Sequence, residues 1–225
     1  MSTLWQRRSV GVFSQPEKRS GALEESGGLE DDGSFNVVAM RVDVSTSEDW
    51  KTNTAAFLDD SFLIGYLTPE EYFYFIGELR QVSKEEVDEL LAGYADFFND
   101  EILNKKKYIR DLSKGNQKKV GVVATFIGAP ELLILDEPFA NLDPTTQIRL
   151  KELLTEKGKD TNTTILISSH DIQHVTEVCE RIAVLEKGEI VKDLQTTTKT
   201  LKELESFGDR PCLPLDPYVL NNWQG

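Results

Sequence analysis

The chain has 225 residues, of which 25 are Lys or Arg and 39 are Asp or Glu, so its net charge is −14. Such an acidic chain is not suited to covering nucleic acid, and 39% hydrophobic with 28% charged residues excludes a wholly disordered or collagen-like chain. The longest nearly unbroken apolar run, residues 120–129, is far shorter than the roughly 20 residues that cross a bilayer. Because no secretory signal is visible and two cysteines are too few for a disulfide framework, we expect a reducing cytoplasm.

Residues 1–35 differ in composition from the rest, because Ser, Glu, Asp and Gly crowd together there without an apolar period. This composition predicts a poorly ordered or degenerate segment. We expect one domain at residues 36–207, with strand-like pieces beginning near Val37 and Ala55. The tail at residues 208–225 shows no periodicity and is expected to be irregular.

Two capping boxes predict two successive helices without a strand between them. Each box combines a hydroxyl with a glutamate three positions later: Thr68 with Glu71, and Ser83 with Glu86. Pro69 stands at the first position of the first helix. In the second helix, apolar residues recur at helical spacing as far as Phe97. We therefore expect a small helical subdomain at about residues 68–112.

Seven cations fall within residues 105–119, around a single acid, Asp111. In a chain of net charge −14 this cluster is a candidate anion site, with a lysine-rich solvated helix end as an equal alternative. Ser113 precedes a long apolar helix, whose first N–H groups and dipole point at whatever lies in front of it. Gly115 permits close approach and Lys114 adds charge, although a plain N-cap would have the same sequence.

The second half of the chain alternates strands with helices. Residues 132–135 and 164–167 are apolar runs that suit strands buried on both faces, and a helix begins between them at Asp143. Asp171 caps a second, short helix, and residues 182–191 form a hairpin. The predicted fold class is α/β, with a mostly parallel sheet and an antiparallel addition.

Polar side chains end two of these strands. Asp136 and Glu137 follow the first strand, at the edge where open α/β sheets bind ligands, and His170 follows the second. One carboxylate can hold Mg²⁺ on a nucleotide while its neighbour polarises an attacking water, with a simple acidic turn as the equal alternative. His174 stands four positions after His170, but no carboxylate or cysteine completes a zinc site, so zinc is set aside.

Taken together, the segments occur in an order that is typical of one family. They closely resemble the signature motif, Walker B strand, D-loop and switch histidine of the ABC-type ATPases, at residues 112–117, 132–138, 141–144 and 168–171. Residues 57–80 resemble that family's Q-loop and the start of its helical subdomain. The resemblance covers about residues 37–195. It implies a P-loop NTPase-like fold with a helical subdomain, here with an incomplete N-terminal part.

The resemblance also implies roles at the end of the sheet. Asp136 resembles the carboxylate that holds Mg²⁺. Glu137 resembles the general base that orients the hydrolytic water, and His170 resembles the switch that senses the γ-phosphate of ATP. The implied cofactors are ATP and Mg²⁺.

A second set of roles concerns a partner. In this family two cassettes pair head to tail, and each signature motif covers the nucleotide held by the other subunit. Ser113 and Gly115, with their neighbours Lys114 and Asn116, are thus expected to contact a partner's ATP. Asp143 is expected to connect the two sites across the interface.

The chain departs from the family pattern in its signature, its Q-loop and its phosphate loop. The signature normally has glycine at Lys114 and glutamine at Asn116, and the Q-loop glutamine falls at Asp59, which cannot donate the same hydrogen bond while ionised. No G-x-x-x-x-G-K-[ST] motif occurs anywhere in the 225 residues. Its position by register, residues 11–22, keeps the pattern of an approach strand but lacks the glycines that surround phosphates.

Three functions remain open from the sequence. The first is the ATP-binding subunit of an ABC transporter, export-type by the resemblance of residues 68–80, docked on a separate permease at the inner face of the cell membrane. The second is a non-hydrolysing cassette that completes an intact partner's ATP site. The third is a truncated or frame-disrupted ABC ATPase without activity of its own. The expected partners are a second cassette, in a homo- or heterodimer, and the permease, with no nucleic acid.

Overall fold

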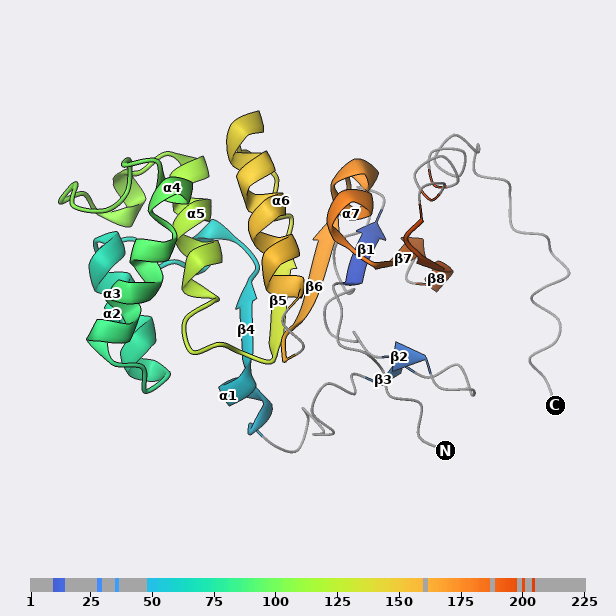
Figure 1. The fold of residues 1–225 in the computed structure, drawn as a ribbon, viewed down its shortest axis with the longest axis horizontal. Coiled ribbons are helices and arrows are strands. Elements are labelled where there is room, and N and C mark those ends of the chain that lie inside the picture. The colour runs from blue at the N-terminus through green and yellow to red at the C-terminus, as the bar shows by residue number, and fades with distance from the viewer. Residues whose placement is uncertain are drawn as a thin grey trace, which may run out of the picture.

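A computed structural model describes residues 10–14, 28–29, 35–36, 48–159, 162–186, 189–197, 200 and 204 of the chain. A six-stranded sheet crosses the molecule in the order β4-β5-β6-β1-β7-β8 (Figure 1). Its strands are β1 (Val10–Ser14), β4 (Thr54–Phe57), β5 (Leu132–Asp136), β6 (Thr164–Ser169), β7 (Arg181–Glu186) and β8 (Glu189–Gln195). Every neighbouring pair is parallel except β7 with β8. The predicted α/β sheet with an antiparallel hairpin is therefore confirmed.

Strand β1 lies near the centre of this sheet, between β6 and β7. Val12 pairs with Ser168 on one side and with Ala183 on the other. The approach strand expected near residue 11 is thus present, and the sheet includes residues that precede the expected domain boundary at residue 36. The position expected for a phosphate loop, after β1, lies outside the described residues, as does the strand-like piece expected at Val37.

Short elements lead into β4. Strands β2 (Gly28–Leu29) and β3 (Phe35–Asn36) form a separate antiparallel pair, and helix α1 (Trp50–Asn53) runs directly into β4. The strand-like piece expected at Ala55 is β4.

Strands β5 and β6 are buried more on one face than on the other. Leu133 and Leu135 are at most 1% exposed, while the alternate residue Ile134 is only partly buried. Strand β6 alternates in the same way, with Ile165 and Ile167 fully buried. The prediction of strands buried on both faces is corrected here, because successive side chains point to opposite faces and the described elements cover one face more fully.

Helices α2 (Pro69–Leu79), α3 (Lys84–Gly93) and α4 (Ala95–Phe98) gather beyond β4 at one end of the molecule (Figure 1). Both predicted capping boxes are formed, and they fix the starts of α2 and α3. The second predicted helix is shorter than expected, because it ends at Gly93 and a new turn carries Phe97 into the core. Glycine lacks the helix propensity to carry the helix across this point.

The other three α-helices are α5 (Lys114–Ala124), α6 (Pro144–Gly158) and α7 (Ile172–Val178). Each begins at a predicted cap, because Ser113, Asp143 and Asp171 accept a backbone N–H from the first turn. On α6, Leu150 and Leu154 are fully buried, whereas Ile148 is 57% exposed. No helix in the described part of the chain is both long and apolar enough to cross a membrane. Residues 208–225 lie outside that part.

Candidate functional site

The carboxyl ends of β5 and β6 bring the predicted polar residues together. Asp136 pairs in register with Ser168 of the neighbouring strand, and the Ser168 hydroxyl donates a hydrogen bond to the Asp136 carboxylate. Glu137 follows Asp136 directly, and its N–H donates to the Ser168 carbonyl at 3.1 Å. The parallel register of two adjacent strands therefore places two carboxylates and the start of the histidine turn at one edge.

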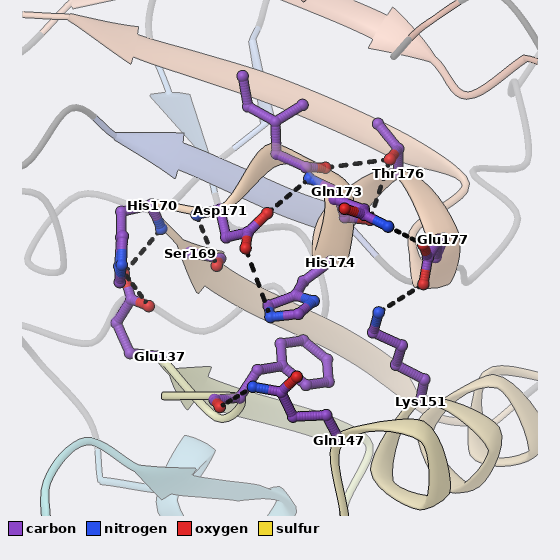
Figure 2. Close-up of polar contacts among 12 residues, drawn as sticks. Glu137, Gln147, Lys151, Ser169, His170, Asp171, Gln173, His174, Thr176 and Glu177 are labelled. Atoms are coloured by element: carbon purple, nitrogen blue, oxygen red, sulfur yellow. Dashed lines mark hydrogen bonds and ion pairs between the residues drawn. The ribbon is translucent and has the colours of Figure 1, made fainter. Parts of the chain in front are cut away.

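Glu137 and His170 hold each other at that edge (Figure 2). Oε2 of Glu137 lies 2.8 Å from Nδ1 of His170, and Oε1 accepts the His170 backbone N–H, also at 2.8 Å. With Glu137 ionised, the shared hydrogen lies on Nδ1, because a carboxylate only accepts. The Glu137 side chain is 11% exposed and that of His170 is 48% exposed. The geometry fixes the carboxylate and leaves the imidazole accessible to a ligand.

Lys118, one of the seven clustered cations and not a predicted site residue, reaches the same edge. Lys118 is 7% exposed, and its Nζ donates to the main-chain carbonyl of Glu137 at 2.7 Å. Burial lowers its pKa, and the carboxylates of Asp60, Glu137, Asp136 and Asp59 oppose that shift. The signal in the sequence is its place one helical turn after Lys114, where α5 becomes buried.

Asp59 stands at the end of β4, beside this edge. Its side chain accepts the Ser61 N–H at 2.8 Å and caps the short 3₁₀ helix η1 (Asp60–Phe62). That hydrogen bond lowers the pKa of Asp59. The residue at the Q-loop position is thus an ionised acceptor, and it does not supply the amide donor of a glutamine.

The signature residues form a second group at the start of α5. Ser113 Oγ accepts the Asn116 N–H at 3.2 Å, and the Asn116 side chain donates to Glu101 at 3.1 Å. Lys114 pairs with Asp60 at 3.6 Å. A Cβ at Gly115 would lie 3.2 Å from the carbonyl oxygen of Asn141, so the glycine lets the signature pack closely on the D-loop.

Asp143 ends that D-loop and begins α6. Its side chain accepts both the hydroxyl and the backbone N–H of Thr146, the latter at 3.0 Å. The side-chain hydrogen bond from Thr146 is the main reason that the pKa of Asp143 is lowered. Its carboxylate is therefore engaged in a helix cap in the single chain.

The described residues contain no group of three or more His, Cys, Asp or Glu side chains that could hold a metal by themselves. Asp136 nevertheless fits Mg²⁺, because this ion is usually held by one or two carboxylates, water and substrate phosphates. Its carboxylate is partly exposed at the sheet edge and accepts a hydroxyl hydrogen bond. The residues expected to form a phosphate loop, directly after β1, lie outside the described part of the chain.

His174 lies behind this edge, in α7. Its ring packs on Phe139 with centroids 4.8 Å apart, its Nε2 lies 3.6 Å from Asp171, and its buried Nδ1 has no partner among the described residues. Figure 2 shows the ring between Asp171 and the turn that follows β5. The contacts of His174 among the described residues are thus those of a packing residue.

The buried position of His174 predicts a pH dependence of folding stability. Desolvation lowers its pKa below the usual 6.5, so the unfolded chain binds a proton first as the pH falls. The stability that neutral His174 contributes is present above pH 6.5 and is lost as the pH falls through the lower, folded pKa. We expect the free energy of unfolding to fall more steeply from pH 7 to pH 5 in the wild type than in His174→Gln, as measured by urea denaturation. Equal slopes would contradict this account.

Comparison with known proteins identifies the family of the chain. The profile of the family described as "AAA domain, putative AbiEii toxin, Type IV TA system" matches residues 18–175. The uncharacterized ABC transporter ATP-binding protein YhaQ of Bacillus subtilis is 37% identical over 157 residues, which are 65% of this chain and 51% of YhaQ. The chain spans about half the length of such curated relatives.

Solved structures share the fold. The structure of cbiO1 from Clostridium perfringens, part of the ABC transporter complex cbiONQ, aligns over 90% of this chain and 82% of its own with a TM-score of 0.65 and 18% identity. A dimeric ATP-binding cassette in a post-hydrolysis state with ADP and Pi aligns over 84% and 86% with a TM-score of 0.65 and 19% identity. The chain therefore belongs to the AAA-domain family, has the P-loop NTPase-like fold of the ATP-binding cassettes, and is similar in sequence to ABC transporter ATP-binding proteins.

Proposed function

We propose that this chain is the ATP-binding subunit of an ABC transporter, in which binding and hydrolysis of MgATP are coupled to transport through a separate membrane permease. The observation that carries the proposal is the pair of contacts between His170 and Glu137. Nδ1 and the backbone N–H of His170 each lie 2.8 Å from one oxygen of the Glu137 carboxylate. A carboxylate fixed in this way, beside a second one at a sheet edge, suits the orientation of an attacking water.

Each residue at the edge would have a separate task. Asp136 would hold Mg²⁺, which neutralises charge on the phosphates when it is bound. Glu137 would orient the water and accept its proton, because its carboxylate is fixed and buried. His170 would meet the terminal phosphate with Nε2, since Nδ1 is committed to Glu137.

A second cassette would complete the assembly. The exposed Ser113 starts a helix of eleven residues, whose first N–H groups favour an anion. Lys114, Gly115 and Asn116 occupy the same turn and would face the partner's ATP. Asp143 would link the two sites, because it starts α6 next to the D-loop residue against which Gly115 packs. A homodimer and a heterodimer both satisfy this geometry.

The permease would dock near Asp59, where the surface is apolar and hollowed. A groove of about 210 Å³ lies among β4, α2 and α5, and its lining includes Phe57, Phe62 and Tyr72. Phe62 is 71% exposed, an exposure that suits contact with an apolar partner helix. This partner would place the chain at the cytoplasmic face of the cell membrane. The direction we propose is export, on the resemblance of residues 68–80 alone.

One observation favours a second candidate function. The sequence contains no G-x-x-x-x-G-K-[ST] motif, and near its expected position Pro16 removes a backbone donor while Glu17 repels phosphate. A cassette of this kind would lend Ser113 and Gly115 to an intact partner and hydrolyse nothing itself. The same absence fits a truncated or frame-disrupted ATPase, and reading the neighbouring coding DNA in all frames distinguishes that case.

Steady-state hydrolysis of MgATP by the purified chain tests the proposed function, with Glu137→Gln as the variant that must lose it. Glu137-dependent turnover by the chain alone supports the first candidate and eliminates the other two. Turnover that appears only after mixing with an intact cassette, and that survives in Glu137→Gln, supports the second.

A further inference from the structure

Lys118 is a charged side chain buried between α5 and the end of the sheet. It is 7% exposed, its ammonium lies 6.0 Å from the centre of the Phe57 ring, and it donates at 2.7 Å to the carbonyl oxygen of Glu137. Lysine is almost never buried this completely without a partner, because an ammonium loses its hydration on burial. The Glu137 carbonyl is the partner that the structure provides.

The backbone at Glu137 has an unusual conformation that needs support. Its φ is 46°, in the left-handed region that residues with a Cβ rarely adopt. The N–H is held by the Ser168 carbonyl at 3.1 Å, and the carbonyl accepts from Lys118 and from the Ala140 N–H at 3.2 Å. The peptide groups on both sides of the residue are thereby fixed, and the direction of its side chain follows from them.

The charges around Lys118 also favour its position at the end of the sheet. Four carboxylates, those of Asp59, Asp60, Asp136 and Glu137, interact favourably with its ammonium. They stand at the ends of two adjacent strands, where their mutual repulsion would otherwise spread the edge. Lys114 pairs with Asp60 at the outer side of this group, and the buried ammonium of Lys118 offsets the repulsion next to Glu137.

We infer that Lys118 is a positioning residue, which holds the left-handed turn at Glu137 so that its carboxylate reaches Nδ1 of His170. Lys118 acts through Glu137, and we propose no direct contact between Lys118 and the nucleotide. Because it belongs to α5, it also ties the helix that starts at Ser113 to the residue proposed as base. This inference rests on the proposed function only for the role of Glu137 as the base.

The test follows the imidazole by NMR in the full chain without nucleotide. His170 and His174 are the two histidines in the sequence, so a His170→Gln variant assigns the ring signals. The wild type is expected to show a slowly exchanging Nδ1–H signal from His170. Lys118→Met, which keeps the apolar stem, should lose that signal while the His174 signals stay in place, and Lys118→Arg should retain it. Lys118→Gln, too short to reach the carbonyl, is measured in parallel in case the Met variant does not fold.

Lys119→Met is the matched control, because Lys119 is 4% exposed on the same helix but lies over Phe97, 5.9 Å from its ring centre. It should keep the His170 signal. An unchanged Nδ1–H signal in a folded Lys118→Met or Lys118→Gln variant would overturn the inference, as would an equal loss in Lys119→Met. If neither the wild type nor any of these variants hydrolyses ATP, the proposed function fails. The positioning role still stands in that case, provided that the His170 signal depends on Lys118.

Discussion

Replacing Glu137 with glutamine is expected to abolish turnover of MgATP, with a loss of about 100-fold or more, which is the usual contribution of a positioned base. Gln has nearly the same shape and still accepts the His170 backbone N–H, so the fold at the edge should persist. Its amide cannot take a proton from water. Asp136, the residue proposed to hold the metal, is unaltered, so whatever nucleotide binding exists should be spared. Steady-state phosphate release, together with equilibrium nucleotide binding, measures the two effects separately.

Glu152→Gln is the matched control for this experiment, because Glu152 is exposed on α6. It should leave the rate unchanged. An unchanged rate in Glu137→Gln would remove Glu137 from its proposed role. A parallel loss of nucleotide binding would show that the residue acts in binding and not as a base.

Replacing Ser113 with arginine is expected to cripple a mixed complex with an intact cassette, even if this chain alone shows no activity. The substitution removes a hydroxyl proposed to face the partner's phosphates, and a hydrogen bond to a charged group is worth about 1.5–3 kcal/mol, or at least about tenfold in rate. The bulk of arginine adds to this loss. Hydrolysis by the mixed complex, at saturating amounts of this chain, gives the rate.

Ser113 is also a helix cap, and cap loss alone costs about 1 kcal/mol of stability. Ser83→Arg separates the two effects, because Ser83 caps α3 by accepting the Glu86 N–H at 3.2 Å, just as Ser113 caps α5. We expect Ser83→Arg to lower thermal stability and to leave the mixed rate near that of the wild type. A wild-type rate in Ser113→Arg, or an equal fall in both variants, would count against a signature that acts on the partner's nucleotide.

Local signals in the sequence predict much of the fold. Thr68 and Ser83 are capping residues with a glutamate three positions later, and both boxes form as expected. The predicted helix end at Phe97 is wrong, because apolar spacing extends the helix through Gly93, a residue that favours its end. Periodicity reports which face is apolar, and it does not report where the backbone breaks.

The candidate site is predictable in part, for a physical reason. Asp136 and His170 end successive buried strands, and parallel pairing alone brings their edges together. The left-handed turn at Glu137 and the reach of Lys118 depend on the packing of α5 against the sheet, which no local pattern encodes. The central place of β1 has the same origin, because its partners β6 and β7 follow it by more than 150 residues.

The central claim is that a magnesium nucleotide binds at the edge where Asp136, Glu137 and His170 meet. The measurement that tests it most directly is an NMR titration of the full chain with MgATP, in which the ring signals of the two histidines are followed. The His170 side chain is 48% exposed at the edge, and that of His174 is 15% exposed behind it. The account predicts saturable shifts of the His170 signals with much smaller shifts at His174, and weakened binding in Asp136→Asn. Unshifted His170 signals at millimolar MgATP, or shifts that Asp136→Asn leaves unaltered, would contradict it.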